Sequence, residues 1–177
     1  LKFAGETPVI QVIINHLEKT FGKLILQWNN FTNCGVRHIQ CPKTYTITLD
    51  QIEYCKALKC IAHPAVKAAN KDDIVGNDLF EQFRSLRGAV AYTLLTRTDI
   101  SVYVVYLQRQ LETTTTYRHI HMLNVLVKRL QSSPQVLRYE HLGPSTKFLV
   151  ITDSAFKKEE QTGHSLKGTL LLRVPAN

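Results

Sequence analysis

Acidic side chains that could hold a catalytic metal ion are sparse along this sequence, and Asp153 is the first candidate. It directly follows the apolar run Lys147–Thr152, where a strand is expected to end. Glu159 and Glu160 come after two lysines and are typical of an exposed turn. Two-metal phosphoryl transfer needs clustered carboxylates that hold both cations in line with the attacking and leaving oxygens. Asp153 alone is therefore a relic metal ligand at most, and the alternative is a solvated aspartate at a strand end.

Thiols and imidazoles offer a second possible metal site. Cys34, His38 and Cys41 lie close together in the sequence and could supply soft ligands, but no fourth ligand is evident, so zinc is disfavoured. Cys55 and Cys60 complete the four cysteines, and none forms a C-x-x-C pair. In a chain of 177 residues that is 44% hydrophobic, reduced thiols are more typical than a disulfide framework. This pattern favours an intracellular, reducing compartment.

Basic residues point to a third chemistry, the binding of a polyanion. The formal net charge is +8 and the isoelectric point is about 9.4. Lysine and arginine that neutralise phosphates drive non-specific nucleic-acid binding. Residues three apart on a helix share a face, and two basic pairs have this spacing. The candidate phosphate-binding residues are Lys56, Lys59, Arg84, Arg87, Lys128, Arg129 and Arg138. The alternative is an ordinary solvated helix face.

The first third of the chain is expected to form a helix, a hairpin and a second helix. Thr7 and Pro8 suit a helix start, and Gly22 suits its end. Alternation of apolar residues with threonines indicates a hairpin with one solvent-exposed face. Asp50 stands three residues before Glu53, as in a capping box. The predicted elements are a helix from Pro8, strands Phe31–Gln40 and Tyr45–Leu49, and a helix through about Lys59.

The rest of the chain is expected to form helices and then strands. Ile61–Asn77 contains Pro64 and Gly76 and is predicted to be a loop. Thr113–Thr116 should interrupt the helical pattern, because β-branched residues with competing hydroxyls disfavour helix. The predicted helices run from Asp78 to about Arg97, from a cap at Asp99 to about Leu111, and over Tyr117–Leu130, and the predicted strands are Gln135–Glu140, Lys147–Thr152 and Leu166–Val174. The class is therefore α+β, and the absence of a run of about 18 apolar residues disfavours a membrane span.

A series of short motifs, in order, runs through the second half of the chain. Its matching residues are Ser85, Leu86, Gly88, Tyr92, Thr96-Arg97, Asp99, Ile100, His119, Lys128-Arg129-Leu130 and Asp153. The series resembles the junction of reverse transcriptase and ribonuclease H in the polyprotein of copia-type LTR retrotransposons. That family typically reads Y-x-S-L-x-G-x-L-x-Y-L, T-R-P-D-I, a helix with H and K-R-L, and S-D-A-D-W. Upstream, the segment 47–54 is similar to the family's I-x-L-S-Q-x-K-Y, and Ser165 and Gly168 are similar to its K-S-T-S-G.

The resemblance implies a division of the chain into partial domains. Residues 1–62 would be a palm remnant with an amphipathic helix and a hairpin, and 63–78 a linker loop. Residues 79–133 would be the helical thumb and connection. Residues 134–177 would be the first strands of a truncated ribonuclease H-like domain. The expected partner is then an RNA–DNA hybrid or duplex nucleic acid, gripped by its backbone.

Departures from the family pattern remove its catalytic groups. The paired aspartates of the polymerase would lie before Leu1. Ala155 and Phe156 replace the second Asp and the Trp of S-D-A-D-W, and Thr98 replaces the Pro of T-R-P-D. Mg²⁺ is the cofactor of the parent family, but one carboxylate cannot clamp two magnesium ions. We therefore expect a non-catalytic fragment without a cofactor. The alternative is a structural or interaction subunit of a larger assembly, with a protein partner that covers open strand edges.

Overall fold

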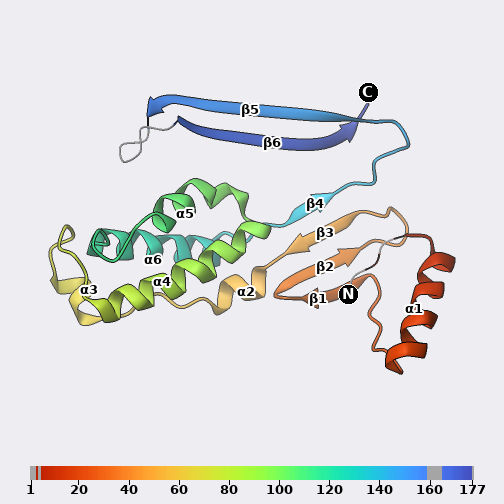
Figure 1. Cartoon of the computed structure of the whole chain (residues 1–177), viewed down its shortest axis with the longest axis horizontal. Helices are drawn as coiled ribbons and strands as arrows, with labels where there is room; N and C mark the ends of the chain where they lie inside the picture. Colours follow the sequence, from red (N-terminus) through yellow and green to blue (C-terminus); the bar gives the residue numbers. More distant parts are fainter. Residues whose placement is uncertain (1–2, 4, 159–164, 177) are drawn as a thin grey trace. The chain divides into compact units, whose positions relative to one another are not determined.

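The computed structural model describes the chain except residues 1–2, 4, 159–164 and 177, and it describes only the backbone of 154–158 and 165–167. Six α-helices and two sheets lie in the described part, so the α+β class is confirmed (Figure 1). The chain forms two compact units. The first unit is Leu1–Gln40 with Thr48–Leu137, and the second unit is Cys41–Ile47 with Arg138–Asn177.

The first helix, α1 (Thr7–Phe21), ends at Gly22 as the sequence predicts, but it begins one residue earlier than predicted, with Glu6 and not Thr7 at the N-cap. Pro8 lies in its first turn after the extended Glu6, and Gly22 follows its last residue with φ +81°. That angle lies in the left-handed region, which glycine adopts without the steric cost of a Cβ. The Gly22 amide donates to Glu18 O at 2.9 Å and so satisfies one of the last helical carbonyls.

The predicted strand Phe31–Gln40 is wrong, because a tight turn divides it. The structure has β1 (Asn30–Asn33) and β2 (Val36–Gln40), which pair antiparallel with Asn33 opposite Val36. Cys34 and Gly35 form the turn with φ of 49° and 72°. Positive φ at both central positions suits the right-handed twist of a hairpin. The signal was the Asn-Cys-Gly sequence, whose glycine we read as part of a strand.

The second predicted strand also shifts along the chain. β3 spans Ile47–Asp50 instead of Tyr45–Leu49, and Tyr45 adopts φ +57° in the preceding turn. The Tyr45 amide donates to Cys41 O at 2.8 Å, which closes that turn. β4 is Leu137–Tyr139, shorter than the predicted Gln135–Glu140, and the four strands lie in the order β1-β2-β3-β4.

Five further helices follow in the first unit: α2 (Ile52–Ala57), α3 (Pro64–Ala68), α4 (Asn77–Tyr92), α5 (Ser101–Gln108) and α6 (Tyr117–Ser132). The loop prediction over Ile61–Asn77 missed α3, which His63 caps by accepting a hydrogen bond from the Ala65 amide. The predicted helix to Arg97 is too long. The chain leaves α4 through two 3₁₀ turns, Thr93–Leu95 and Thr98–Ile100.

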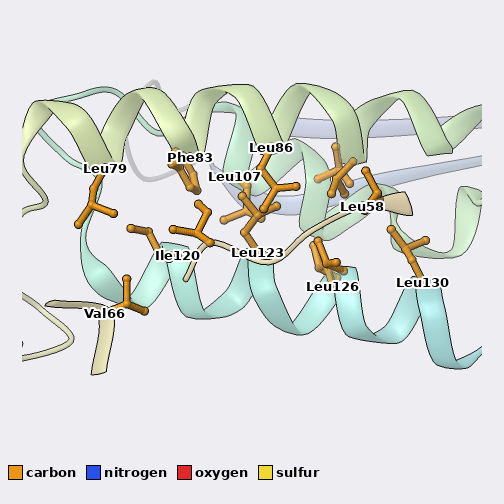
Figure 2. Close-up of a cluster of buried hydrophobic side chains, with 14 of the residues drawn as sticks. Leu58, Val66, Leu79, Phe83, Leu86, Leu107, Ile120, Leu123, Leu126 and Leu130 are labelled. Carbon is orange, nitrogen blue, oxygen red and sulfur yellow. The ribbon is translucent and has the colours of Figure 1, made fainter. Parts of the chain in front are cut away.

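The core of the first unit lies between α4, α5 and α6, with residues of the α2–α3 segment added (Figure 2). On α6, Ile120, Leu123, Val127 and Leu130 are at most 1% exposed. Their spacing of three and four residues makes one continuous apolar stripe. Phe83, fully buried on α4, points toward that stripe (Figure 2). The helical prediction over Tyr117–Leu130 is confirmed.

The second unit contains a two-stranded antiparallel ribbon, β5 (Thr146–Lys158) with β6 (Ser165–Pro175). Both strands are longer than the predicted Lys147–Thr152 and Leu166–Val174. Before the ribbon, Thr46 Oγ1 donates to Glu140 Oε2 at 2.9 Å. The Tyr45 ring also packs against His141, with ring centroids 5.9 Å apart.

Candidate functional site

Two side-chain amides fasten the segment that follows α2 along one face of α6. Asn124 Oδ1 accepts from the Ile61 amide at 2.8 Å, and Asn124 Nδ2 donates to Ile61 O at 3.0 Å. Gln131 Nε2 donates to Leu58 O at 2.7 Å. Residues four or three apart on a helix share a face. Lys128 therefore lies on the face of α6 that carries both amides, beside the fastened segment.

Lys56 and Lys59 flank Leu58, the residue whose carbonyl Gln131 holds, and Lys128 lies on the same face of α6. We call these three predicted cations the lysine face: Lys56, Lys59 and Lys128. All three side chains are exposed. Lys56 Nζ forms an ion pair with Glu53 at 2.9 Å, also exposed. Among the described residues, Lys59 and Lys128 have no acidic partner within ion-pair distance. Two positive charges on this face are thus available to a phosphate.

The α4 arginines differ in their surroundings. Arg84 is exposed and pairs with Glu81 one turn earlier, at 2.6 Å. Arg87 is half-buried, and its Nη1 donates to three carbonyls at the end of α5, those of Leu107, Gln108 and Gln110. A cation is favourable there because the last helical carbonyls carry partial negative charge. Arg87 therefore holds α5 against α4, a role that sequence reasoning missed.

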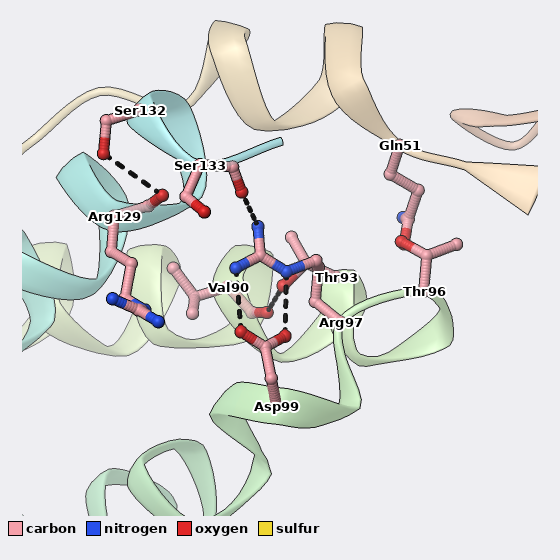
Figure 3. Close-up of polar contacts among 9 residues, drawn as sticks. All are labelled: Gln51, Val90, Thr93, Thr96, Arg97, Asp99, Arg129, Ser132 and Ser133. Atoms are coloured by element: carbon pink, nitrogen blue, oxygen red, sulfur yellow. Dashed lines mark hydrogen bonds and ion pairs between the residues drawn. The ribbon is translucent and has the colours of Figure 1, made fainter. Parts of the chain in front are cut away.

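The two remaining predicted cations lie elsewhere. Arg129 is exposed on α6, and Figure 3 shows it near the Arg97–Asp99 pair. Arg138 belongs to the second unit and forms an ion pair with Glu140. The structure thus brings together only part of the predicted phosphate-binding set, and the lysine face is that part.

A buried polar junction joins the end of α4 to the end of α6 (Figure 3). Arg97 is 2% exposed; its Nε and Nη2 donate to Asp99 at 2.8 and 2.9 Å, and its Nη1 donates to Ser133 O at 2.9 Å. These hydrogen bonds hold the pKa of Asp99 below its ordinary value. The predicted cap at Asp99 is wrong, because α5 begins at Ser101 and the Asp99 carboxylate accepts two hydrogen bonds from Arg97 instead.

The N-terminus of α6 is closed by a capping box that uses histidine. The Thr116 amide donates to His119 Nδ1 at 2.9 Å, and His119 Nε2 lies 3.2 Å from Tyr106 Oη. Glutamate or glutamine ordinarily accepts this bond, so a histidine three residues after Thr116 is not recognisable as a capping box from sequence. Accepting at Nδ1 requires an unprotonated nitrogen. Burial, with a smaller effect of the Arg118 charge, lowers the pKa of His119.

We expect acid to loosen α6 through His119. Its pKa is lower in the folded than in the unfolded chain, so the stabilisation is complete above the unfolded value, about 6.5, and is lost as pH falls through the folded value. His119→Gln keeps an acceptor without the titration. The free energy of unfolding, measured by urea denaturation between pH 7.5 and 5, should fall more steeply for the wild type than for this variant. Equal slopes would contradict the assignment.

The predicted metal candidates do not cluster. Among the described residues, no three His, Cys, Asp or Glu side chains are placed to hold a metal ion. His38 stacks on Phe31 with ring centroids 4.9 Å apart, and all four cysteines are free thiols. Asp153 is exposed on β5 opposite Gly168. Glu159 and Glu160 lie outside the described residues.

An open apolar hollow of about 460 Å³ lies between α1 and the segment that leads into β1. Ile14 and Leu17 line it from the helix, and Trp28 and Phe31 from the other side. Among the described residues, no ionisable side chain lines it. None of the helices in the described part has the length and apolarity needed to cross a membrane.

Comparison with known proteins gives no relative: no protein-family model, no curated protein and no solved structure matches the chain. The similarity of its motifs to the copia-type polyprotein therefore stays a prediction.

Proposed function

We propose that this chain is a non-catalytic segment of a copia-type reverse transcriptase and ribonuclease H polyprotein, whose helical part binds the nucleic-acid backbone. The observation that carries the proposal is the lysine face: Lys128 is exposed on α6, and Lys56 and Lys59 are exposed on the segment that Asn124 and Gln131 attach to the same face of α6. Phosphate contacts from lysine give position and affinity without reading sequence. The ligand we expect is an RNA–DNA hybrid or duplex nucleic acid.

The wider sequence supports the same proposal. The order hairpin, short helix, helical cluster and strands agrees with the order of motifs in the family. The net charge of +8 supports binding to a polyanion. Contacts from these lysines to phosphates would carry no sequence information, so we expect binding without base preference.

Binding should weaken steeply with salt. Each phosphate neutralised by a lysine contributes about 0.9 to the slope of log affinity against log salt on B-DNA. We expect the double variant Lys59→Gln/Lys128→Gln to lower that slope by about 1.8 on duplex DNA. Fluorescence anisotropy at 50 and 200 mM salt, with a duplex and an RNA–DNA hybrid, measures it.

Lys19→Gln/Lys23→Gln is the matched control, because it removes the same two charges from exposed positions at the end of α1 and just after it. It should leave the slope nearly unchanged. Equal losses in the control and the double variant would mean that net charge, not the lysine face, drives binding. Magnesium-dependent primer extension or hybrid cleavage by the purified chain would refute the non-catalytic part.

A second function, that of an interaction subunit, is favoured by one observation. The β5–β6 ribbon exposes large apolar side chains, among them Phe148 at 70% and Leu171 at 61%. Contiguous exposed apolar surface marks interaction sites in soluble proteins. A chain that binds no nucleic acid at low salt would make this the better proposal.

A further inference from the structure

The β5–β6 ribbon is apolar on both of its faces. Its three central cross-strand pairs are Leu149–Leu172, Val150–Leu171 and Ile151–Leu170. Successive residues of a strand point to opposite faces, so the middle pair lies on one face and the outer two pairs on the other. All six side chains are between 37% and 61% exposed. Neither face of this ribbon suits contact with water alone.

Strands with this composition normally lie inside a sheet. Apolar residues on both faces are typical of strands that are paired on both edges and covered on both sides. An isolated two-stranded ribbon is at best marginally stable in water, and three or more strands are needed for independent stability. In the described part of the chain, the ribbon pairs with no third strand. The outer edges of β5 and β6 are thus templates for pairing.

The charges along the two strands distinguish these edges. In the central part of β5, Lys147 and Asp153 stand three residues to either side of Val150. On β6 the charged residues are Lys167 and Arg173, with no acidic residue between them. Like charges placed opposite one another in a sheet are destabilising, and opposite charges are stabilising. Pairing of β6 with its own copy would therefore be opposed, whereas pairing of β5 would not.

We propose that two copies of this chain pair through β5, antiparallel about a two-fold axis at Val150, into a four-stranded sheet in the order β6-β5-β5-β6. This register places Lys147 opposite the partner's Asp153, and Leu149 opposite the partner's Ile151. Opposite residues in an antiparallel pair point to the same face, so the apolar faces of the two ribbons become continuous. The inference goes beyond the proposed function and does not depend on it.

The charged groups are accessible for this pairing. Asp153 is exposed and has no ion-pair partner among the residues that the structure describes. Lys147 Nζ donates to Ala176 O at 3.1 Å. A lysine ammonium carries three N–H donors, so Lys147 can keep this bond and also reach a carboxylate.

The test is the association of the full chain by sedimentation velocity from 5 to 100 µM. We expect a reversible monomer–dimer equilibrium, weakened tenfold or more by Asp153→Lys and also by Lys147→Asp, since each places like charges across the axis. An equimolar mixture of the two variants should form heterodimers more tightly than either variant forms homodimers, because positions 147 and 153 are then both cationic on one strand and both anionic on the other.

The controls separate this pairing from other associations. Arg173→Asp changes the net charge as much as Lys147→Asp, but on β6, and should leave dimerisation intact. Asp153→Asn removes one charge with little change of shape and should weaken dimerisation by less than Asp153→Lys. If charge reversal unfolds the ribbon, this variant still tests whether the Asp153 charge contributes to dimerisation. A wild-type monomer at 100 µM, or association that ignores every β5 variant, would overturn the proposal.

Discussion

Asp99→Ala should destabilise the protein by about 3 kcal/mol, because it leaves the Arg97 guanidinium buried without its carboxylate. Arg97 is 2% exposed and the Asp99 side chain is 28% exposed, so the arginine cannot recover the lost bonds from water. Ser133 O would remain an acceptor for Nη1 only. Urea denaturation of the variant and the wild type at pH 7 measures the difference in the free energy of unfolding.

A double-mutant cycle tests whether the buried, unpaired charge of Arg97 causes the loss of stability in Asp99→Ala. Arg97→Met removes the guanidinium and leaves Asp99 partly hydrated, so Arg97→Met/Asp99→Ala should be more stable than Asp99→Ala alone. Strictly additive losses would contradict this account.

The pH dependence gives a second check. The pKa of Asp99 is lowered on folding, so its contribution is present above the unfolded value, about 3.9, and is lost as pH falls through the folded value.

Long periodic segments were the predictable part of this fold. α6 was predicted to within two residues, since its apolar stripe repeats over four turns and the threonine run marks its start. α1 was equally clear, because Pro8 and Gly22 mark its ends. Local apolar periodicity and the residues that start and stop a helix determine where such helices lie. Tertiary packing adds stability without moving their ends.

The wrong predictions have a different origin. In each case, a residue far away in the sequence determines the side-chain or backbone conformation. Gly35 was read as part of a strand, although Tyr54 packs 3.2 Å from where a Cβ would lie. Arg97 was read as the end of a helix, although Ser133, 36 residues later, accepts its hydrogen bond. The Asn-Cys-Gly sequence marks the turn at Gly35, but the partners of both residues are non-local, and a single sequence does not show which distant residue each one contacts.

The candidate site shows the same division. Helical spacing predicted that Lys56 and Lys59 share a helix face, but α2 ends at Ala57, so Lys59 lies beyond the helix. Nothing in the sequence linked either lysine to Lys128. That link depends on Asn124 and Gln131, whose amides fasten backbone 63 and 73 residues away. Arg87 shows the reverse, since its helix was predicted and its three carbonyl partners on the next helix were not.

Leu123→Ala should be the other strongly destabilising change, by about 3 kcal/mol. Leu123 is fully buried on the inner face of α6, and truncation removes apolar contacts and leaves a cavity between packed helices. Rigid neighbours on both helices limit how far the cavity can collapse. Thermal and urea unfolding followed by circular dichroism at 222 nm measure the loss.

Val125→Ala is the matched control for Leu123→Ala, because it truncates an aliphatic side chain of the same helix that is 62% exposed. Alanine also has the higher helix propensity, so this change should alter stability by no more than about 0.5 kcal/mol. Comparable losses at both positions would mean that the outer face of α6 is packed as well as the inner one. That result would also move Lys128, three residues from Val125, off the exposed surface and so remove the structural basis of the lysine face.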